Sequence, residues 1–306
     1  MAIPAGALRA ALRAAEAQLF ALPNVRGVGL GRKQGRGRPA GDVCVRVYVA
    51  LKVPAPELEP ADRVPTILHA ADQTIPTDVA EIGEPLIQSF AGRVRPVLPG
   101  YSVGNLRITA GTVGGFLRGP AGEHYLLSNN HVLADEDRAE NGSVVVQPGP
   151  ADGGRDPADR IGVLTWAHPL NREGENDADV ALARLDDGIG GANDYGGIGP
   201  VSRTGSLRLG AQVRKVGRTT GLTHGEITDR DVTIDVWFDT GILRFRGQAL
   251  ATAMSQPGDS GSVIVDSKAR AVALLFAGST LATVVTPMAQ VQRVISASAP
   301  GPLSWA

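Results

Sequence analysis

The segment Gln256-Pro-Gly-Asp-Ser-Gly-Ser262 carries the strongest chemical signal in this chain. A serine hydroxyl is a poor nucleophile at neutral pH, so it needs a base to take its proton and backbone N–H groups to hold an oxyanion. Glycines flank Ser260 on both sides and allow a tight turn. In that turn we expect the N–H groups of Gly258 and Ser260 to converge as an oxyanion hole. Taken alone, Gly-Asp-Ser-Gly is as compatible with an ordinary loop.

A candidate base lies in the segment Tyr125-Leu-Leu-Ser-Asn-Asn-His-Val-Leu-Ala134. His131 follows an apolar stretch that is typical of a strand, and small and apolar residues come after it. A strand end can hold an imidazole rigidly while one face of the ring stays open. Because a lone histidine is more often structural than catalytic, His131 gains meaning only together with the other two segments.

A candidate carboxylate lies in the segment Asn176-Asp-Ala-Asp-Val-Ala-Leu-Ala183. Asp179 stands at the start of an apolar strand, which would draw it toward the core. A buried carboxylate needs a partner, and a histidine Nδ1–H can supply one and so fix the ring tautomer. Asp177 competes for this role, because strand alternation would place it on the same face. We favour Asp179 because it directly precedes the apolar run.

The order histidine, aspartate, serine is that of the chymotrypsin class. The three segments around His131, Asp179 and Ser260 resemble the motif blocks of trypsin-like serine peptidases, over about residues 93–306. The stretch Val213-Arg-Lys-Val-Gly-Arg-Thr-Thr-Gly-Leu-Thr-His-Gly225 also resembles bacterial members of that class. The chain departs from the family where Ser-Asn-Asn-His-Val replaces the common Thr-Ala-Ala-His-Cys. The disulfide partner of that cysteine is also absent, as in intracellular branches.

The resemblance implies a mainly β fold for 93–306, with two six-stranded antiparallel β-barrels of the chymotrypsin type and a C-terminal helix. The local pattern agrees, because short runs rich in Val, Ile, Leu and Thr alternate with turn residues. The predicted strands include 107–112, 143–147, 212–216, 232–237, 262–265 and 271–276, and a helix is expected at about 287–297.

The resemblance also implies a serine endopeptidase that acts on protein or peptide substrates without a metal or organic cofactor. The alternative is a catalytically silent scaffold of the same fold that binds peptides or partner proteins. By resemblance the base of the S1 pocket is Met254, and its wall comes from Leu275, Phe276, Ala277 and Gly278. No acidic residue stands at that base, so we expect an apolar P1 side chain. Met254 is equally compatible with a plain core position.

Residues 1–92 are predicted to form a separate small α/β domain. A helix is expected over 5–21 and strands over 24–32 and 42–53, joined by the basic, glycine-rich segment 31–38. The glycines at 27, 29 and 31 do not form a nucleotide loop, because they lie within a strand that leads to a hairpin. The region resembles an extension found in a bacterial and plant branch of trypsin-like proteins. Its role is open between substrate docking, homo-oligomer formation and regulation of access.

Composition and cysteine content bear on the possible partners and on the cellular compartment. The chain has 306 residues, 43% of them hydrophobic, and a formal net charge of -1, which gives no indication of a nucleic-acid or membrane partner. The lone cysteine, Cys44, excludes an intramolecular disulfide. The N-terminal segment lacks the pattern of a secretory signal peptide. Together these features predict a cytoplasmic protein. In trypsin-type activation a freed N-terminus would pair with Asp259. The long N-terminal domain makes this route unfavoured.

Overall fold

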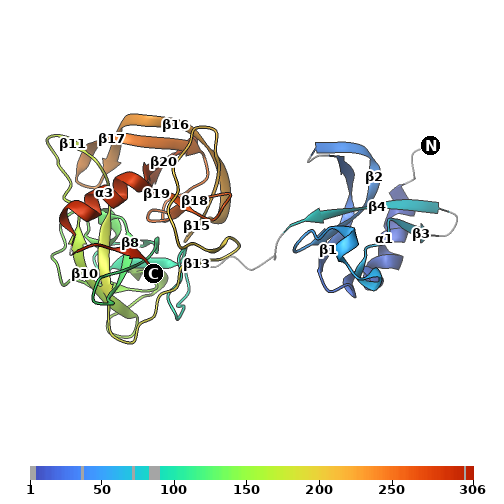
Figure 1. The fold of residues 1–306 in the computed structure, drawn as a ribbon, viewed down its shortest axis with the longest axis horizontal. Helices are drawn as coiled ribbons and strands as arrows, with labels where there is room; N and C mark the ends of the chain where they lie inside the picture. Colours follow the sequence, from blue (N-terminus) through green and yellow to red (C-terminus); the bar gives the residue numbers. More distant parts are fainter. Residues whose placement is uncertain (1–4, 36–37, 71–72, 83–89, 300) are drawn as a thin grey trace. The chain divides into compact units, whose positions relative to one another are not determined.

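The computed structural model describes residues 5–35, 38–70, 73–82, 90–299 and 301–306 (Figure 1). The chain forms two compact units, Met1–Ile87 and Gln88–Ala306. The smaller unit is an α/β unit and the larger one is mainly β. The candidate catalytic segments all belong to the larger unit.

The smaller unit packs one helix against a four-stranded sheet. Its elements are α1 (Ala5–Phe20), β1 (Val25–Gly35), β2 (Arg38–Val49), β3 (Ile67–Ala70) and β4 (Gln73–Glu81), with 3₁₀ turns at Ala55–Glu57 and Pro60–Asp62. The strand order is β1-β2-β4-β3, with β2 and β4 parallel. Apolar residues three or four apart in α1 give the helix one buried face. That face and the sheet share a core that includes Leu8, Ala11, Ala15, Leu19, Val45, Val47 and Ile75.

The basic, glycine-rich segment differs from the expected connecting segment. Strand β1 continues to Gly35 and β2 already begins at Arg38, while β2 ends at Val49 rather than at 53. Two glycines inside β1 have a packing role. A Cβ atom at Gly27 or Gly29 would press on the Tyr48 side chain of β2, so the glycines leave space for that ring. The glycines therefore serve strand packing, as expected for close approach in a sheet.

The first sheet of the larger unit has eight strands in the order β21-β7-β8-β12-β10-β9-β5-β6. The segment 111–118 bends, so that its first part pairs with β5 and its second part with β8. The bend therefore connects β6, at one end of the strand order, with β7, the second strand from the other end. The strands are β5 (Ser102–Asn105), β6 (Gly111–Thr112), β7 (Gly115–Arg118), β8 (His124–Ser128), β9 (Val144–Val146), β10 (Arg160–Ala167), β12 (Ala181–Leu185) and β21 (Ser304–Trp305).

The second sheet closes on itself. Pairing of β17 with β20 completes a ring of six antiparallel strands, and β11 adds to β17 in parallel. Figure 1 shows this sheet above the first one. Its strands are β11 (Glu175–Asn176), β15 (Gln212–Gly217), β16 (Gly221–Phe238), β17 (Gly241–Thr252), β18 (Val263–Asp266), β19 (Ala271–Gly278) and β20 (Ala282–Pro287). The mainly β class of this unit is confirmed.

Short elements complete the larger unit. They are α2 (Asn130–Leu133), the 3₁₀ turn Pro150–Asp152, the pair β13 (Asp194–Tyr195) and β14 (Gly199–Pro200), and the helix α3 (Met288–Ser298). The C-terminal helix is therefore confirmed. Two strand expectations were wrong in extent. Of 107–112 only the last two residues are strand, and 232–237 is part of the 18-residue strand β16, which pairs with β17 along a long hairpin.

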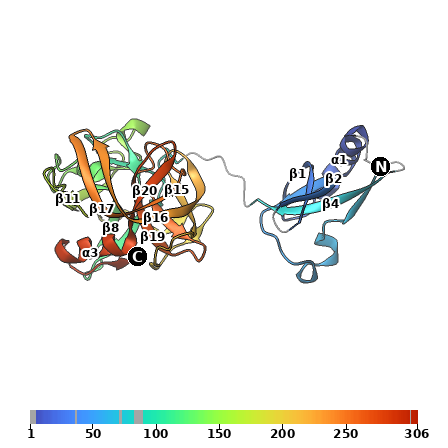
Figure 2. The same cartoon turned by 90° about the horizontal axis from the view of Figure 1, so that it is seen from above.

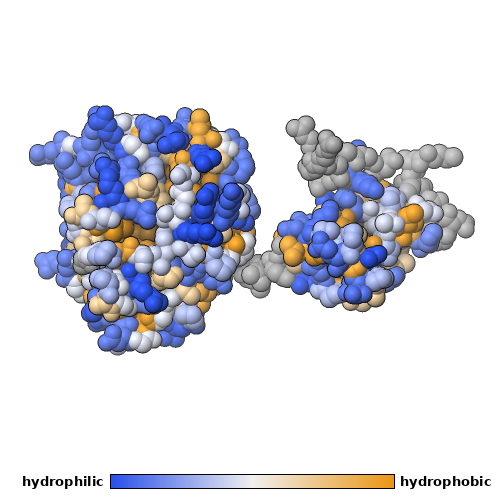
Figure 3. All heavy atoms as spheres, viewed as in Figure 1, coloured by the Kyte–Doolittle hydropathy of each residue, from blue (hydrophilic) through white to orange (hydrophobic). Residues whose placement is uncertain are grey.

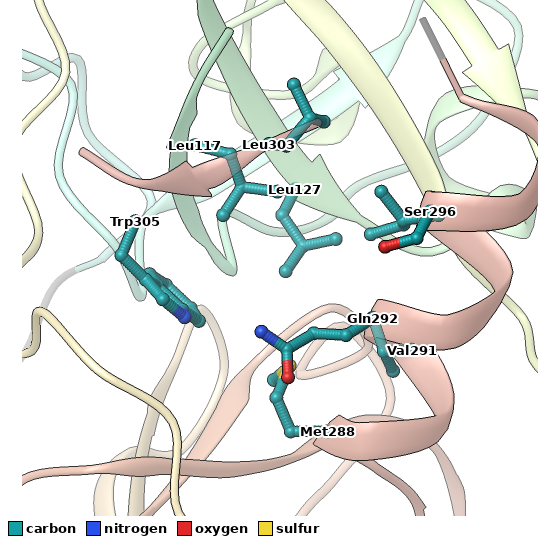
Figure 4. A pocket seen from close by; sticks show the side chains of 9 residues that line it. Leu117, Leu127, Met288, Val291, Gln292, Ser296, Leu303 and Trp305 are labelled. Atoms are coloured by element: carbon teal, nitrogen blue, oxygen red, sulfur yellow. The ribbon is translucent and has the colours of Figure 1, made fainter. Parts of the chain in front are cut away.

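Helix α3 follows β20 and packs against β19 and β20 of the second sheet (Figures 1 and 2). A small pocket remains between the helix, strands β7 and β8, and the C-terminal segment (Figure 4). Leu117, Leu127, Met288, Val291 and Trp305 contribute to its lining.

On the face in Figure 3, apolar residues of this unit gather near the centre with hydrophilic residues around them. Within the described residues, none of the helices has the length and apolar character needed to cross a bilayer.

The core of the smaller unit offers a direct stability test. Ile75 is fully buried in β4, whereas Ile67 in the neighbouring β3 is 45% exposed. We expect Ile75→Ala to lower the free energy of unfolding of this unit by about 2–5 kcal/mol, because it leaves a cavity. The matched variant Ile67→Ala should cost far less. Urea unfolding followed by circular dichroism measures both, and equal losses would contradict this description of the core.

Candidate active site

The pairing of β8 with β12 brings His131 and Asp179 together. Ser128 pairs with Ala181, so the chain leaves β8 toward His131 at the edge where Asp179 leads into β12. The Asn129 side-chain amide donates to the Asp179 carbonyl oxygen at 2.7 Å. His131 lies in the short helix α2, three residues past the last strand residue rather than at the strand end. The sheet register thus fixes the distance between the two side chains.

The imidazole and the carboxylate form a buried hydrogen bond. His131 Nδ1 is hydrogen-bonded to Asp179 Oδ2, and the His131 backbone N–H donates to Asp179 Oδ1 at 3.2 Å. Asp179 is fully buried and the His131 side chain is 24% exposed. Burial opposes protonation of the ring, but the charge and hydrogen bond of Asp179 outweigh it, with Glu136 and Asp239 adding to the effect. The pKa of His131 therefore lies above its ordinary value.

Asp177 does not share this position. Its carboxylate lies at the surface, where Arg293 Nη2 donates to it at 3.3 Å. The alternation argument that made Asp177 a competitor was wrong, because β12 begins only at Ala181 and residues 177–180 are not regular strand. The structure brings Asp179 to His131 and turns Asp177 away.

The Ser260 turn lies against the first sheet. Thr112 N–H donates to the Ser260 carbonyl oxygen at 2.8 Å, and Thr112 Oγ1 donates to the Gly258 carbonyl at 2.8 Å. A Cβ atom at Gly261 would overlap the Ser128 hydroxyl, so this close approach requires glycine. Ser128 ends β8, three residues before His131. The turn therefore lies beside the segment that carries the imidazole.

The backbone of the turn has positive φ at both glycines. Gly258 has φ of 97° and Gly261 has φ of 98°, a region that favours glycine. Among the hydrogen bonds of the described residues, the N–H groups of Gly258 and Ser260 donate to no acceptor. The Ser260 hydroxyl donates to the Phe276 carbonyl at 3.3 Å, and none of the described hydrogen bonds joins it to His131.

Comparison with known proteins identifies the larger unit. Residues 111–274 match the family model of the trypsin-like peptidase domain. The chain belongs to this family. The match spans all three candidate catalytic positions, from β6 to β19. A comparison with curated proteins found no relative.

Several solved structures are similar to this trypsin-like peptidase. Protease A of Thermobifida fusca is 17% identical, with a TM-score of 0.50 over 69% of this chain and 98% of that one. A Nocardiopsis protease is 19% identical, with a TM-score of 0.49 over 64% of this chain and 95% of that one. A Cellulomonas bogoriensis chymotrypsin is 18% identical, with a TM-score of 0.49 over 69% and 98%. At such identities the likeness concerns the chymotrypsin-type fold alone.

The trypsin-like peptidase holds a second buried carboxylate next to the serine. Asp259 and Lys215 are both fully buried, and Lys215 Nζ donates to Asp259 Oδ2 at 3.1 Å. Asp259 also accepts from the amides of Thr219, Thr220 and Gln256 at 2.9–3.1 Å. Burial lowers the pKa of Lys215, and Asp259 opposes that shift. A buried charge pair of this kind is held only when further hydrogen bonds satisfy it.

The residues predicted to bind substrate fall into two groups. Met254 is 4% exposed and packs in the core of the second sheet together with Leu275. The Phe276 side chain is also buried, while Ala277 is half-buried and Gly278 is exposed. The side chains of Met254 and Leu275 therefore occupy core positions, and their predicted role in S1 stays a prediction. The backbone of 276–278 lies next to Ser260, as the Phe276 carbonyl shows.

Three residues of this site escaped the sequence analysis. Lys215 stands within the alternating strand pattern Val213-Arg-Lys-Val216, where an inward-facing lysine was the available signal. Phe238 lies edge-on to the His131 ring, with centroids 5.8 Å apart. Glu136 accepts a hydrogen bond from the backbone N–H of Asp239, the residue after Phe238. Nothing local in the sequence marks these two contacts. Across the described part of the chain, no cluster of three His, Cys, Asp or Glu side chains could hold a metal ion.

The Lys215–Asp259 pair predicts a large effect of one substitution. Lys215→Met should lower the free energy of unfolding by about 3–5 kcal/mol, because it leaves a carboxylate buried without its counter-charge. Chemical denaturation measures the loss. The control is Arg244→Met, whose partner Asp235 is an exposed residue of the same sheet, and it should change stability little. A Lys215→Met protein as stable as the Arg244→Met protein would refute the structural role given to the pair.

Proposed function

We propose that this trypsin-like peptidase is an active serine endopeptidase with Ser260 as nucleophile, His131 as general base and Asp179 as the group that orients the imidazole. The observation that carries the proposal is the buried hydrogen bond between His131 Nδ1 and Asp179, formed beside the Ser260 turn. That bond places the proton on Nδ1 and leaves Nε2 as an acceptor.

The proposed reaction needs a change of partner for the Ser260 hydroxyl. The hydroxyl has to leave the Phe276 carbonyl and donate instead to His131 Nε2. Ser260 Oγ then attacks the peptide carbonyl carbon while His131 takes its proton. The developing oxyanion accepts hydrogen bonds from the Gly258 and Ser260 amides. His131 next donates the proton to the departing amine, and water hydrolyses the acyl-enzyme by the same route.

The buried pair beside the nucleophile supports a turn that is ready for catalysis. Lys215 and four hydrogen bonds from neighbouring residues hold the Asp259 carboxylate. In this proposal the internal lysine supplies the positive charge, so a freed N-terminus is not needed to order the oxyanion hole. This is consistent with the sequence-based expectation that such activation is unfavoured.

Covalent labelling tests the proposal directly. A fluorophosphonate probe should label the wild-type protein at Ser260 and leave Ser260→Ala unlabelled, with the site assigned by peptide mass spectrometry. Asp179→Asn should slow labelling by up to about 10⁴-fold, because an amide no longer fixes the correct tautomer.

The chain supplies a matched control for that variant. Asp177→Asn makes the same chemical change two residues away, at a carboxylate that faces Arg293 instead of His131. It should label at the wild-type rate. A folded wild-type protein that resists the probe would instead favour the silent scaffold that binds peptides.

Specificity is the second part of the proposal. We expect S1 to take an apolar P1 side chain, because Met254 lies where the family places the pocket base and the wall strand carries only Leu275, Phe276, Ala277 and Gly278. Reporter peptides that end in Leu should be cleaved at least tenfold faster, in kcat/KM, than peptides that end in Lys, since the pocket offers a cation no counter-charge. Equal rates would overturn this assignment.

A further inference from the structure

The loop that follows His131 has an unusual backbone. Asp135, Glu136 and Asp137 have φ of 53°, 56° and 67°, three consecutive non-glycine residues in the left-handed region. L-residues adopt this region at a cost in free energy and as a rule singly. A run of three therefore has to be stabilised by contacts made elsewhere.

The two aspartates tie the loop to its own surroundings. Asp135 Oδ1 accepts from Arg138 Nη2 at 2.6 Å, and Arg107 Nε lies 3.2 Å from Asp135 Oδ2. Asp137 and Asn130 exchange two hydrogen bonds, from the Asn130 side-chain amide and from the Asp137 N–H. These contacts hold the loop against the helix that carries His131.

Glu136 instead reaches a distant segment. Its Oε1 accepts from the Asp239 N–H at 2.9 Å and its Oε2 from the Thr240 N–H at 3.0 Å. These amides form the turn between β16 and β17. Burial opposes ionisation of Glu136, but the hydrogen bonds from Thr240 and Asp239 outweigh it, so the pKa of this carboxyl lies below its usual value. A buried carboxylate thus fixes the hairpin tip.

The hairpin tip carries an aromatic ring to the imidazole. Phe238 directly precedes the turn, and its ring plane is 87° from that of His131. Phe238 stacks on Phe245 with centroids 5.7 Å apart, and Phe245 packs on Phe276 at 4.7 Å. Phe276 in turn accepts the Ser260 hydroxyl through its carbonyl oxygen. A continuous column of rings therefore runs from the imidazole to the strand beside the nucleophile.

The geometry points to Glu136 as a positioning residue, which binds the 239–240 turn and so holds Phe238 against the imidazole of His131. This inference rests on the proposed function of His131 as the general base. Three carboxylates raise the pKa of the ring: Asp179 before β12, Glu136 in the loop after α2 and Asp239 in the hairpin turn. Asp179 dominates, while the other two add negative charge on the hairpin side.

Glu136→Gln tests both consequences, because it keeps the size of the side chain but removes the charge and one acceptor. A looser Phe238 should lower kcat by about 10- to 100-fold, as misplacement of a catalytic group does. Loss of the charge should lower the pKa of His131. Since only the neutral ring accepts the serine proton, the acidic limb of kcat/KM should move to lower pH.

Two further variants separate the contributions. Glu140→Gln removes an exposed charge four residues along the chain and should leave both the rate and the pH profile unchanged. Phe238→Leu keeps apolar contact and the Glu136 carboxylate, so it should lower kcat without moving the limb to lower pH. Should Glu136→Gln fold poorly, as thermal unfolding would show, Phe238→Leu still decides whether the ring contact matters.

Titration of the His131 ring by NMR in the Ser260→Ala background keeps the two proposals apart, because it needs no catalysis. A lower pKa in Glu136→Gln than in Glu140→Gln supports the effect of the Glu136 charge on the imidazole even if the wild-type protein never labels, while kcat of Phe238→Leu reports on the ring contact. An unchanged His131 pKa together with an unchanged kcat would overturn the role of Glu136 and leave the triad proposal standing.

Discussion

The structure depends on the side chain of Asp179, a carboxyl group that is fully removed from water. Such a group is tolerated only when donors surround it, and Asp179 receives both the Nδ1 atom and the backbone N–H of His131. The contact exists because β8 and β12 pair in one register, with Ser128 opposite Ala181. A shift of one residue would turn the strand faces over and separate the pair. The register of the sheet and the orientation of the imidazole are therefore the same constraint.

A second buried carboxylate fixes the other half of the site. Asp259 binds Lys215 and receives amides from the 219–220 segment and from Gln256. These hydrogen bonds fix the Asp259 side chain, and they thereby restrict the backbone of the turn that carries its neighbour Ser260. One carboxylate orients the imidazole of His131 and the other shapes the turn that carries Ser260. Each comes from a different sheet, so the packing of the two sheets sets the relation between them.

Much of this could be predicted from local sequence. The glycines that flank Ser260 predict the turn there, and short apolar runs between turn residues predict strands such as β15, β18 and β19. The preference for Asp179 over Asp177 was predicted, but the alternation argument for the competitor failed, because residues 177–180 have no regular strand geometry. Periodicity places a residue on a face only where the backbone is regular.

The contacts that escaped prediction join segments about 40 or more residues apart. Lys215 in β15 meets Asp259 in the turn before β18, and Glu136 meets the 239–240 turn at the tip of the β16–β17 hairpin. The alternating run 232–237 predicts the end of β16 that leads into this turn, but no local pattern shows which loop the turn meets. The hairpin returns the chain to the loop after His131, where a ring from the second sheet touches an imidazole from the first. The imidazole is thus held by both sheets: its hydrogen bond comes from one and its aromatic contact from the other.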